Sequence, residues 1–485
     1  MIDNKNVSTT SGQWERINMR NVAHLIGVEF IHDLYNRHEP KINSIRFRHT
    51  VTIWKDGIVN SYARAHEWRR LEELLGHQYY RLDPLIINQT KLLYRRRREH
   101  FHAFIKTLHA TNFTKLSDAD LFSVLTNFQS LVLGELYVLN FVQVEYALNK
   151  TIKKILHELV PNEQKVEEIF MRLIQTETPT ESQREKQALY KIAGKWRLRK
   201  KISLYDERRA RKDVESHFEK YQYLYSAYGE TPKHFDSFWT TFEEYLSQKT
   251  PPPIQKNTSR LLTRESRKTL RELKDTRLDT LIPLLVTGGI FRDTNKALLG
   301  QSMRYRFAIL NEIARRGLET RGALDFYLLA EIADLLRQGK RLDPQEVLAR
   351  KEKGVVFTRF EDFQVYDKNI LPIVPPSNTS RMLQGQCASR GSCTGECKIV
   401  LTKKDAHKVK PGDIMVAIGT DFDLIEAMYR SAAVITEEGG ILSHASVVCR
   451  EINKPCCMSV KQATKILKDG QRVRVEATRG EIFLL

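Results

Sequence analysis

The spacing of apolar residues divides the 485-residue chain into a long helical part and a shorter part in which strands and helices alternate. From Pro84 onward, apolar residues recur every three or four positions for roughly three hundred residues, which is typical of amphipathic helices. After about Leu383, short apolar runs alternate with helical segments. The predicted fold class is therefore multidomain α plus α/β, with a large mainly helical domain followed by a compact C-terminal α/β domain.

Near the N-terminus, an aromatic and basic stretch at residues 14–38 predicts a helix. Two strand-like runs follow at 49–54 and 58–63, on either side of Lys55-Asp56-Gly57. Two short runs separated by a turn that contains glycine predict a β-hairpin. This hairpin is expected to begin the helical domain.

Residues 85–110 predict one helix that contains four consecutive arginines, Arg95 to Arg98. Consecutive helical residues point about 100° apart, so these four side chains cannot share one face. Arg97 lies four residues from both Leu93 and Phe101, which predicts that it points inward. An inward arginine needs a carboxylate or phosphate partner. A solvated basic face with one buried salt bridge is the favoured interpretation, and an anion or acceptor site at Arg97 is the alternative.

The sequence Ser117-x-x-Asp120 resembles a capping box and begins a helix that is predicted to extend through Leu139. Glu135 and Glu145 lie in this mostly apolar stretch and are candidate partners for the arginines. Further helices are predicted at 162–175, 182–198, 204–222, 233–248, 264–286, 296–316 and 325–338, the last two ending near Gly317 and Gly339.

Prolines cluster in residues 361–382, which predicts a connector that is stiff but free to turn at its ends. The expected organisation is an N-terminal segment at 1–40, a helical acceptor-binding domain at 41–360, this connector, and an α/β domain at 383–485. In the α/β domain, strands are predicted at 397–401, 414–417, 433–435, 472–475 and 481–485, and helices at 423–430, 444–452 and 461–467.

Composition is that of a soluble globular protein, with 41% hydrophobic and 28% charged residues. The polar N-terminus lacks an apolar signal segment, and no apolar run approaches the roughly 20 residues that cross a bilayer. We therefore expect a cytoplasmic protein with no membrane partner. The six cysteines have irregular spacing and no C-x-x-C pair, so we expect small, buried, reduced residues and no metal site. They are Cys387, Cys393, Cys397, Cys449, Cys456 and Cys457.

The net charge of +19 lies mainly on the helical part. Residues 383–485 contain 15 Lys and Arg against 12 Asp and Glu, or +3, which leaves 63 against 47, or +16, for residues 1–382. A basic body attracts nucleic acid, acidic proteins or phosphorylated small molecules, and charge alone does not distinguish them. No motif that interleaves aromatic residues for RNA binding is found, so nucleic acid is the disfavoured partner.

The most distinctive chemistry lies at His444. An apolar strand ending at Ile435 leads into Gly439-Gly440 and then into a helix with Ser443 as a good N-cap residue type. A histidine in the first turn of this helix lies near unpaired backbone N–H groups and the positive end of the helix dipole. A neutral imidazole is also a competent nucleophile near pH 7. This arrangement predicts a histidine that accepts and holds a phosphoryl group; a core histidine at a helix start is the disfavoured alternative.

The motif Gly439-Gly440-x-x-Ser443-His444-Ala445, followed by Arg450-Glu451 and Pro455, resembles the phosphohistidine signature of the swivelling, or mobile, domain of PEP-utilising enzymes. That domain occurs in phosphoenolpyruvate synthases, pyruvate phosphate dikinases and rifampicin phosphotransferases. The resemblance continues in order from about Leu383 to Leu485. It implies His444 as the catalytic residue. It also implies a phosphate-binding set of Gly439, Gly440, Ser443, Thr420 and Arg450, with Arg450 favoured as a structural pair.

In that family, ATP phosphorylates the histidine at a separate ATP-grasp domain, and the phosphohistidine then moves to an acceptor site. The sequence contains no recognisable ATP-grasp unit and no Walker-type loop. The leading hypothesis is therefore a phosphotransferase component charged in trans by an ATP-grasp partner, with ATP and Mg²⁺ expected at the partner's donor site. The alternative is a non-catalytic binding protein that uses its basic helical body for an acidic partner or RNA.

Overall fold

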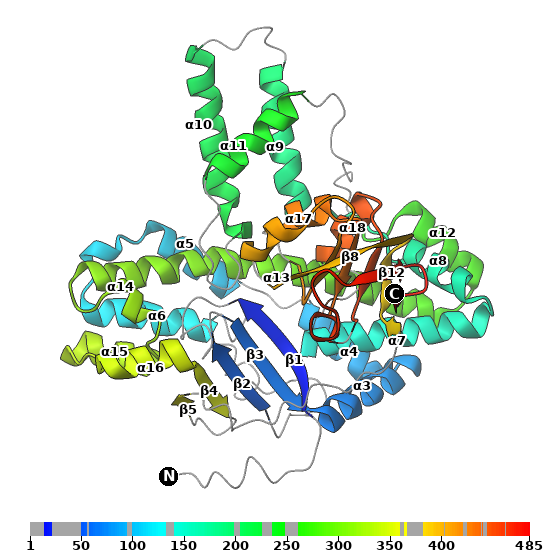
Figure 1. Cartoon of the computed structure of the whole chain (residues 1–485), viewed down its shortest axis with the longest axis horizontal. Helices are drawn as coiled ribbons and strands as arrows, with labels where there is room; N and C mark the ends of the chain where they lie inside the picture. The colour runs from blue at the N-terminus through cyan, green and yellow to red at the C-terminus, as the bar shows by residue number, and fades with distance from the viewer. Residues whose placement is uncertain are drawn as a thin grey trace.

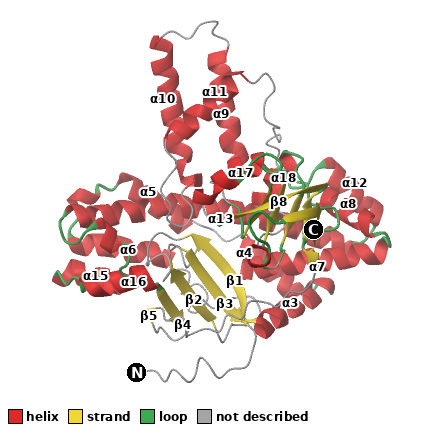
Figure 2. Ribbon diagram, viewed as in Figure 1, coloured by secondary structure: helices red, strands yellow, loops and turns green. Residues whose placement is uncertain are grey.

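The computed structural model shows a helical body that carries one antiparallel sheet and is joined to an α/β domain (Figures 1 and 2). The structure describes residues 14–21, 50–55, 58–94, 99–131, 140–197, 204–225, 235–247, 260–358, 363–365, 382–401, 403–420, 424–437, 439, 444–460 and 462–485. The predicted fold class is confirmed at this level. Arg97, Glu135, Gly440 and Ser443 lie outside the described residues.

The antiparallel sheet contains five strands in the order β1-β3-β2-β4-β5. Their bounds are β1 Trp14–Asn21, β2 Thr50–Lys55, β3 Ile58–Arg64, β4 Val355–Thr358 and β5 Phe363–Val365. The predicted hairpin is confirmed as β2 and β3, which pair in register from Thr50 with Ala63 to Lys55 with Ile58. Strands from far beyond the hairpin complete the sheet, because β4 pairs with β2 and β5 pairs with β4.

Two expectations about these segments are wrong. Residues 14–21 form β1 and not the beginning of a helix. The register between β1 and β3 shifts between Arg16 and Asn18, and such a bulge interrupts the alternation by which a strand is recognised. The connector predicted at 361–382 is also shorter than expected, because β5 lies inside it and Met382 begins the next strand.

Helices form the rest of the body, and most predicted segments are confirmed. They are α3 Ala65–Tyr80, α4 Pro84–Tyr94, α5 Glu99–Ala110, α6 Asp118–Leu131, α7 Asn140–Leu159, α8 Glu163–Leu173, α9 Glu181–Arg197, α10 Leu204–Tyr221, α11 Phe235–Ser247, α12 Arg264–Leu273, α13 Thr276–Arg315, α14 Arg321–Leu324, α15 Leu329–Gln338 and α16 Pro344–Lys353. Short 3₁₀ turns occur at η1 Phe113–Lys115 and η3 Gln222–Tyr225. The single helix predicted at 85–110 is described as α4 and α5, with residues 95–98 outside the described part.

Helix α13 contradicts the predicted boundaries. It continues for 40 residues through Pro283 and Gly288-Gly289, whereas two helices were expected, ending at 286 and beginning at 296. The break lies earlier, where Lys274 adopts a left-handed conformation and Asp275 accepts hydrogen bonds from the first backbone N–H groups of α13. Tertiary packing overrides the local preferences of proline and glycine here, because α13 is apolar on many sides and buried along much of its length.

Helices α9, α10 and α11 form an arm that projects from the body (Figure 1). The arm has its own hydrophobic cluster, and beside it the buried side chains of His217 and Glu185 are hydrogen-bonded at 2.8 Å. It meets α13 at η3, where a Cβ atom added to Gly300 would lie 2.2 Å from the carbonyl oxygen of Tyr223. Only glycine permits this close approach of two backbones.

The C-terminal domain contains a mixed sheet, described as eight strands in the order β6-β13-β12-β8-β9-β10-β11-β7. They are β6 Met382–Gln384, β7 Gln386–Ser389, β8 Ser392–Val400, β9 Ile414–Ala417, β10 Ala433–Thr436, β11 Cys456–Met458, β12 Arg472–Glu476 and β13 Glu481–Leu484. Helices α17 Ile425–Arg430, α18 His444–Glu451 and α19 Ala463–Ile466 accompany it. The domain packs beside the body, and Asn149 of α7 donates to Gln386 of β7 at 3.3 Å.

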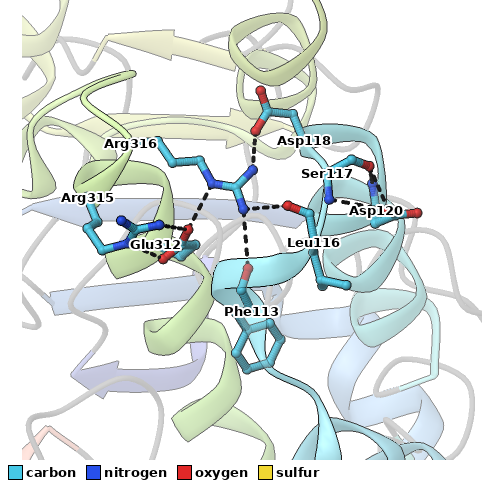
Figure 3. A network of polar contacts seen from close by, with 8 residues as sticks. All are labelled: Phe113, Leu116, Ser117, Asp118, Asp120, Glu312, Arg315 and Arg316. Carbon is cyan, nitrogen blue, oxygen red and sulfur yellow. Dashed lines mark hydrogen bonds and ion pairs between the residues drawn. The ribbon is translucent and has the colours of Figure 1, made fainter.

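The last turn of α13 is joined to η1 and α6 by one arginine (Figure 3). Arg316 donates to the Glu312 carboxylate at 2.9 Å, to Asp118 at 2.5 Å, and to the carbonyl oxygens of Phe113 and Leu116 at 3.2 and 2.6 Å. The predicted capping box is confirmed beside it, since Ser117 and Asp120 exchange hydrogen bonds at the start of α6. Within the described residues, no helix is long and apolar enough to cross a membrane.

The contact of η3 with α13 predicts opposite effects for two glycine substitutions. Gly300→Ala should lower the free energy of unfolding by about 1–3 kcal/mol, because the added methyl group must displace a backbone carbonyl. Gly194→Ala, in α9, adds a methyl group with no heavy atom within 4 Å, and should raise stability by about 0.5–1 kcal/mol. Thermal unfolding of the full chain measures both. Equal effects of the two variants would contradict the close approach at Gly300.

The network at Glu312 predicts a dependence of stability on pH. Hydrogen bonds from Arg315 and Arg316 lower the pKa of the Glu312 carboxyl from 4.5 to about 2. The stabilisation is complete above about pH 4.5 and is lost as the pH falls through about 2. Glu312→Gln should therefore destabilise the protein by about 2 kcal/mol or more near neutrality. The difference in the free energy of unfolding between Glu312→Gln and the unsubstituted protein should shrink as the pH falls below 4.5.

Denaturant unfolding between pH 7 and pH 3 tests this expectation. The matched control is Glu272→Gln, because Glu272 forms an exposed pair with Lys268 at 3.7 Å and such pairs contribute little. A Glu312→Gln variant as stable as the Glu272→Gln variant would show that the network does not stabilise the body.

Candidate functional site

Four neighbouring strands of the C-terminal sheet run parallel, from β8 through β9 and β10 to β11. Their carboxyl ends therefore lie at one edge of the sheet, which is where open α/β sheets bind ligands. Thr420 follows β9, Gly439 follows β10 and Ser459 follows β11. Two of the predicted site residues, Thr420 and Gly439, are thus brought to the same edge from segments about 20 residues apart.

Helix α18 begins at His444, as predicted, directly after the loop that leaves β10. The structure describes the backbone of His444 and not its side chain. Ala445, Val448 and Cys449 are buried, so this face of the helix is fixed against the sheet. Val447 and Ile452 of the same segment are half-buried. This packing fixes where the first turn of α18 lies relative to the carboxyl edge.

The loop between β10 and α18 is anchored at its start by two side chains. Glu437 is nearly buried, and its carboxylate accepts hydrogen bonds from both the backbone N–H, at 2.7 Å, and the hydroxyl of Thr464. The hydroxyl of Ser459 donates to the carbonyl oxygen of Gly439 at 2.9 Å. Gly439 has φ +125°, a conformation that side chains disfavour. Glu437 and Gly439 are therefore held in place by residues that follow β11.

Sequence reasoning did not assign Glu437, Ser459 or Thr464 to the site. An acidic residue directly after a buried strand was the available signal for Glu437. No local pattern identifies Ser459, which contacts Gly439 from 20 positions further along the chain.

Comparison with known proteins agrees with this geometry. The family model described as "PEP-utilising enzyme, mobile domain" matches residues 409–480, which include Thr420, Gly439, His444 and Ser459. The C-terminal part of the chain carries the sequence of a PEP-utilising enzyme mobile domain.

Several proteins named phosphoenolpyruvate synthase are similar in sequence to part of this chain. A probable phosphoenolpyruvate synthase of Archaeoglobus fulgidus is 41% identical over 102 residues, which are 21% of this chain and 14% of that protein. The phosphoenolpyruvate synthase of Pyrococcus furiosus is 43% identical over 21% of this chain and 12% of that protein. That of Aeropyrum pernix is 32% identical over 181 residues, 37% of this chain and 20% of that protein. The chain thus spans a fifth or less of these relatives' length.

Among solved structures, Thermococcus kodakaraensis aconitase X in its holo-form is 20% identical over 22% of this chain and 99% of that chain, with a TM-score of 0.18. This similarity is too low to support a conclusion about fold or function.

Arg450 lies in the last turn of α18 and not at its start. Its Nη1 donates to the carbonyl oxygen of Ala388 in β7 at 3.3 Å. Six residues separate it from His444, a rise of about 9 Å along the helix. This contact within the mobile domain agrees with a structural pairing, whereas a phosphate contact for Arg450 or for half-buried Thr420 stays a prediction.

Five of the six cysteines of the mobile domain are buried, and all six are free thiols. Burial raises the pKa of Cys387 to about 11 and that of Cys397 to about 12, so these thiols are protonated and act as small apolar side chains. Among the residues that the structure describes, no group of three or more His, Cys, Asp or Glu side chains is arranged to hold a metal ion.

Outside the mobile domain, the anion site proposed at Arg97 falls in a segment that is not described, and so does its candidate partner Glu135. Glu145, the other candidate, lies in α7 and pairs with Arg292 of α13 at 2.5 Å. That carboxylate therefore joins two helices of the body.

The Glu437–Thr464 contact predicts a local effect of Thr464→Val. Loss of a charge-assisted hydrogen bond to a buried carboxylate should destabilise the surrounding structure by about 1.5–3 kcal/mol. Amide hydrogen exchange in β9 and β10 of the full chain should therefore become at least about ten-fold faster. Thr394→Val, at an exposed position of β8, is the matched control. Unchanged exchange in Thr464→Val would show that this contact does not hold the loop.

Proposed function

We propose that the chain is a phosphotransferase component in which His444 carries a phosphoryl group. The observation that carries this proposal is the position of His444 as first residue of α18, at the carboxyl edge of the parallel strands and inside the segment that matches the mobile domain. Relatives named phosphoenolpyruvate synthase, similar over the same segment, support phosphoryl transfer as the class of reaction.

In the first step, an imidazole nitrogen of His444 attacks the transferred phosphorus of ATP held by a separate ATP-grasp protein. A nitrogen–phosphorus bond forms, and the phosphorus–oxygen bond to the nucleotide diphosphate leaving group breaks. Mg²⁺ at the partner's site neutralises charge on the phosphates when it is bound. In the second step, a nucleophilic group of an acceptor held by the helical body attacks the phosphorus; the bond from the acceptor to phosphorus forms, the nitrogen–phosphorus bond breaks, and the imidazole of His444 leaves.

The surroundings of His444 suit these steps. The first N–H groups of a helix have no partner within the helix, and a phosphoryl group at His444 lies beside them. The carbonyl of Gly439 is fixed by Ser459, and Glu437 is fixed by Thr464, so the loop is held before the phosphoryl group arrives. Positioning and electrostatics do most of the work in phosphoryl transfer.

Labelling with γ-³²P-ATP tests the proposal. In the presence of a candidate ATP-grasp partner, the full chain should acquire phosphate that is labile to acid and stable to base. His444→Ala should lose essentially all of this label. His407→Ala is the matched control and should keep it, because His407 is the other histidine of residues 383–485 and lies on the surface at 403–408.

Label that persists in His444→Ala would overturn the assignment of His444. If the chain takes no label from any candidate donor, while binding an acidic protein or RNA tightly, the non-catalytic alternative is supported instead.

A further inference from the structure

A cleft of about 500 Å³ lies between η1 and the C-terminal end of α13. Thr111, Asn112 and Phe113 line one side, and Asn311, Glu312 and Arg315 line the other. Its volume is in the range of sites that bind small molecules. The segments that line it lie beside α5, α6 and α14, at the end of the body away from the mobile domain (Figure 1).

One wall of the cleft carries an arginine that is exposed and yet held in place. The Arg315 side chain is 60% exposed, and its Nε and Nη2 each donate to the Glu312 carboxylate at 2.7 Å (Figure 3). The Glu312 side chain is only 4% exposed. A two-point contact with a buried carboxylate fixes the plane of the guanidinium, whereas an exposed arginine usually keeps its rotamer freedom. The contact with Glu312 uses Nε and Nη2 of Arg315, which lines the cleft.

The amide groups beside Arg315 have their oxygen atoms already engaged. Oδ1 of Asn112 accepts from the backbone N–H of Thr114 at 3.1 Å, and Oδ1 of Asn311 accepts from Nε of Arg321 at 2.9 Å. The backbone N–H of Thr114 and the Nε–H of Arg321 can only donate a hydrogen bond. Each amide must therefore turn its oxygen atom toward that donor, which fixes its orientation. Each asparagine therefore presents its Nδ2 donor group. Both carboxylate oxygens of Glu312 are likewise occupied by Arg315 and Arg316.

The cleft thus combines amide groups with the guanidinium of Arg315, and both oxygens of the one carboxylate in its lining, Glu312, are occupied by Arg315 and Arg316. We propose that it binds a small organic molecule through a carboxylate or phosphate group, with Arg315 as the charge partner. An oxyanion has only acceptors to offer and matches such a wall. The ring of Phe113 gives apolar surface for the remainder of the ligand.

The simplest competing explanation is that Arg315 only ends helix α13. Arg316 already performs this task, since it contacts Glu312, Asp118 and two backbone carbonyls. The hydrogen bonds of Arg315 go to Glu312, which keeps Arg316 when Arg315 is replaced. Substitution of Arg315 should therefore destabilise the body less than loss of the whole network, and the variant should stay folded for binding measurements.

The cleft is also suited to hold the acceptor of the proposed phosphoryl transfer, and this extension rests on the proposed function. Strand β5 of the body ends at Val365, and strand β6 of the mobile domain begins at Met382. The 16 residues at 366–381 connect them. Fully extended, they span at most about 55 Å. Anion binding in the cleft does not depend on whether the anion is the phosphoryl acceptor.

Calorimetric titration of the full chain tests the site, with phenyl phosphate and benzoate as the anionic probes and benzamide as the neutral analogue of the same ring. At least one anion should bind at least about ten-fold more tightly than benzamide. Arg315→Gln should weaken that anion by about ten-fold or more; because it also removes two hydrogen bonds to buried Glu312, the titration is made well below the unfolding temperature of the variant. The matched control is Arg304→Gln, on the same helix outside the cleft, where Arg304 forms an exposed pair with Glu219 at 3.3 Å.

Two results would overturn the site: no binding of either anion, or equal weakening by Arg304→Gln and Arg315→Gln, which indicates non-specific attraction to a basic surface. Tighter binding of phenyl phosphate than of benzoate identifies the phosphate group as the recognised anion, and the reverse identifies a carboxylate. Labelling of His444 in Arg315→Gln is measured separately. If the cleft binds an anion but His444 never acquires label, the anion site stands and the phosphotransfer proposal is wrong.

Discussion

Burial of helix α13 is the constraint on which the helical body depends. This helix of 40 residues spans about 60 Å and contacts α4, α5, α6, α7, α9 and α14 along its length. Leu281, Leu285 and Ile309 are fully buried on it, so the free energy of apolar burial is distributed along the whole helix. That distribution explains why Pro283 and Gly288 do not break it. The approach of neighbouring groups to Gly288 and Gly300 requires residues without a side chain, since Tyr94 and Tyr223 occupy the space.

The mobile domain follows a different principle, because its site is assembled by the direction of strands. Parallel pairing of β9, β10 and β11 places the residues after each strand together, and the packing of α18 then fixes the start of that helix. Lys454 strengthens this arrangement by donating to the carbonyl oxygens of Met428 and Tyr429 at 2.8 and 2.7 Å, which joins the end of α17 to the beginning of β11. Such contacts involve few residues and recur wherever the local sequence recurs.

This difference explains what the sequence could predict. The hairpin around Gly57, the capping box at Ser117 and Asp120, and the strands at β9 and β10 depend on neighbours within a few positions, and each was predicted. Strand β4 was missed because its partner β2 lies some three hundred positions earlier, and β5 in turn pairs with β4. The division of α13 into helices ending at 286 and beginning at 296 was wrong because burial keeps the helix continuous through Gly288 and Gly289. The anchors Glu437 and Ser459 depend on contacts between separate loops, which spacing does not reveal.

The two halves of the proposed reaction, the phosphoryl carrier and the acceptor site, differ in the same way. A phosphoryl carrier needs one imidazole and one helix start, which a run of some 20 residues around His444 contains. An acceptor site needs shape and several donors, and in the cleft these come from Asn112 and Arg315, about two hundred positions apart. A family match can therefore identify the first half from residues 409–480 alone. The second half has to be inferred from the body itself, where the arrangement of donors and occupied acceptors carries the information that a motif carries in the mobile domain.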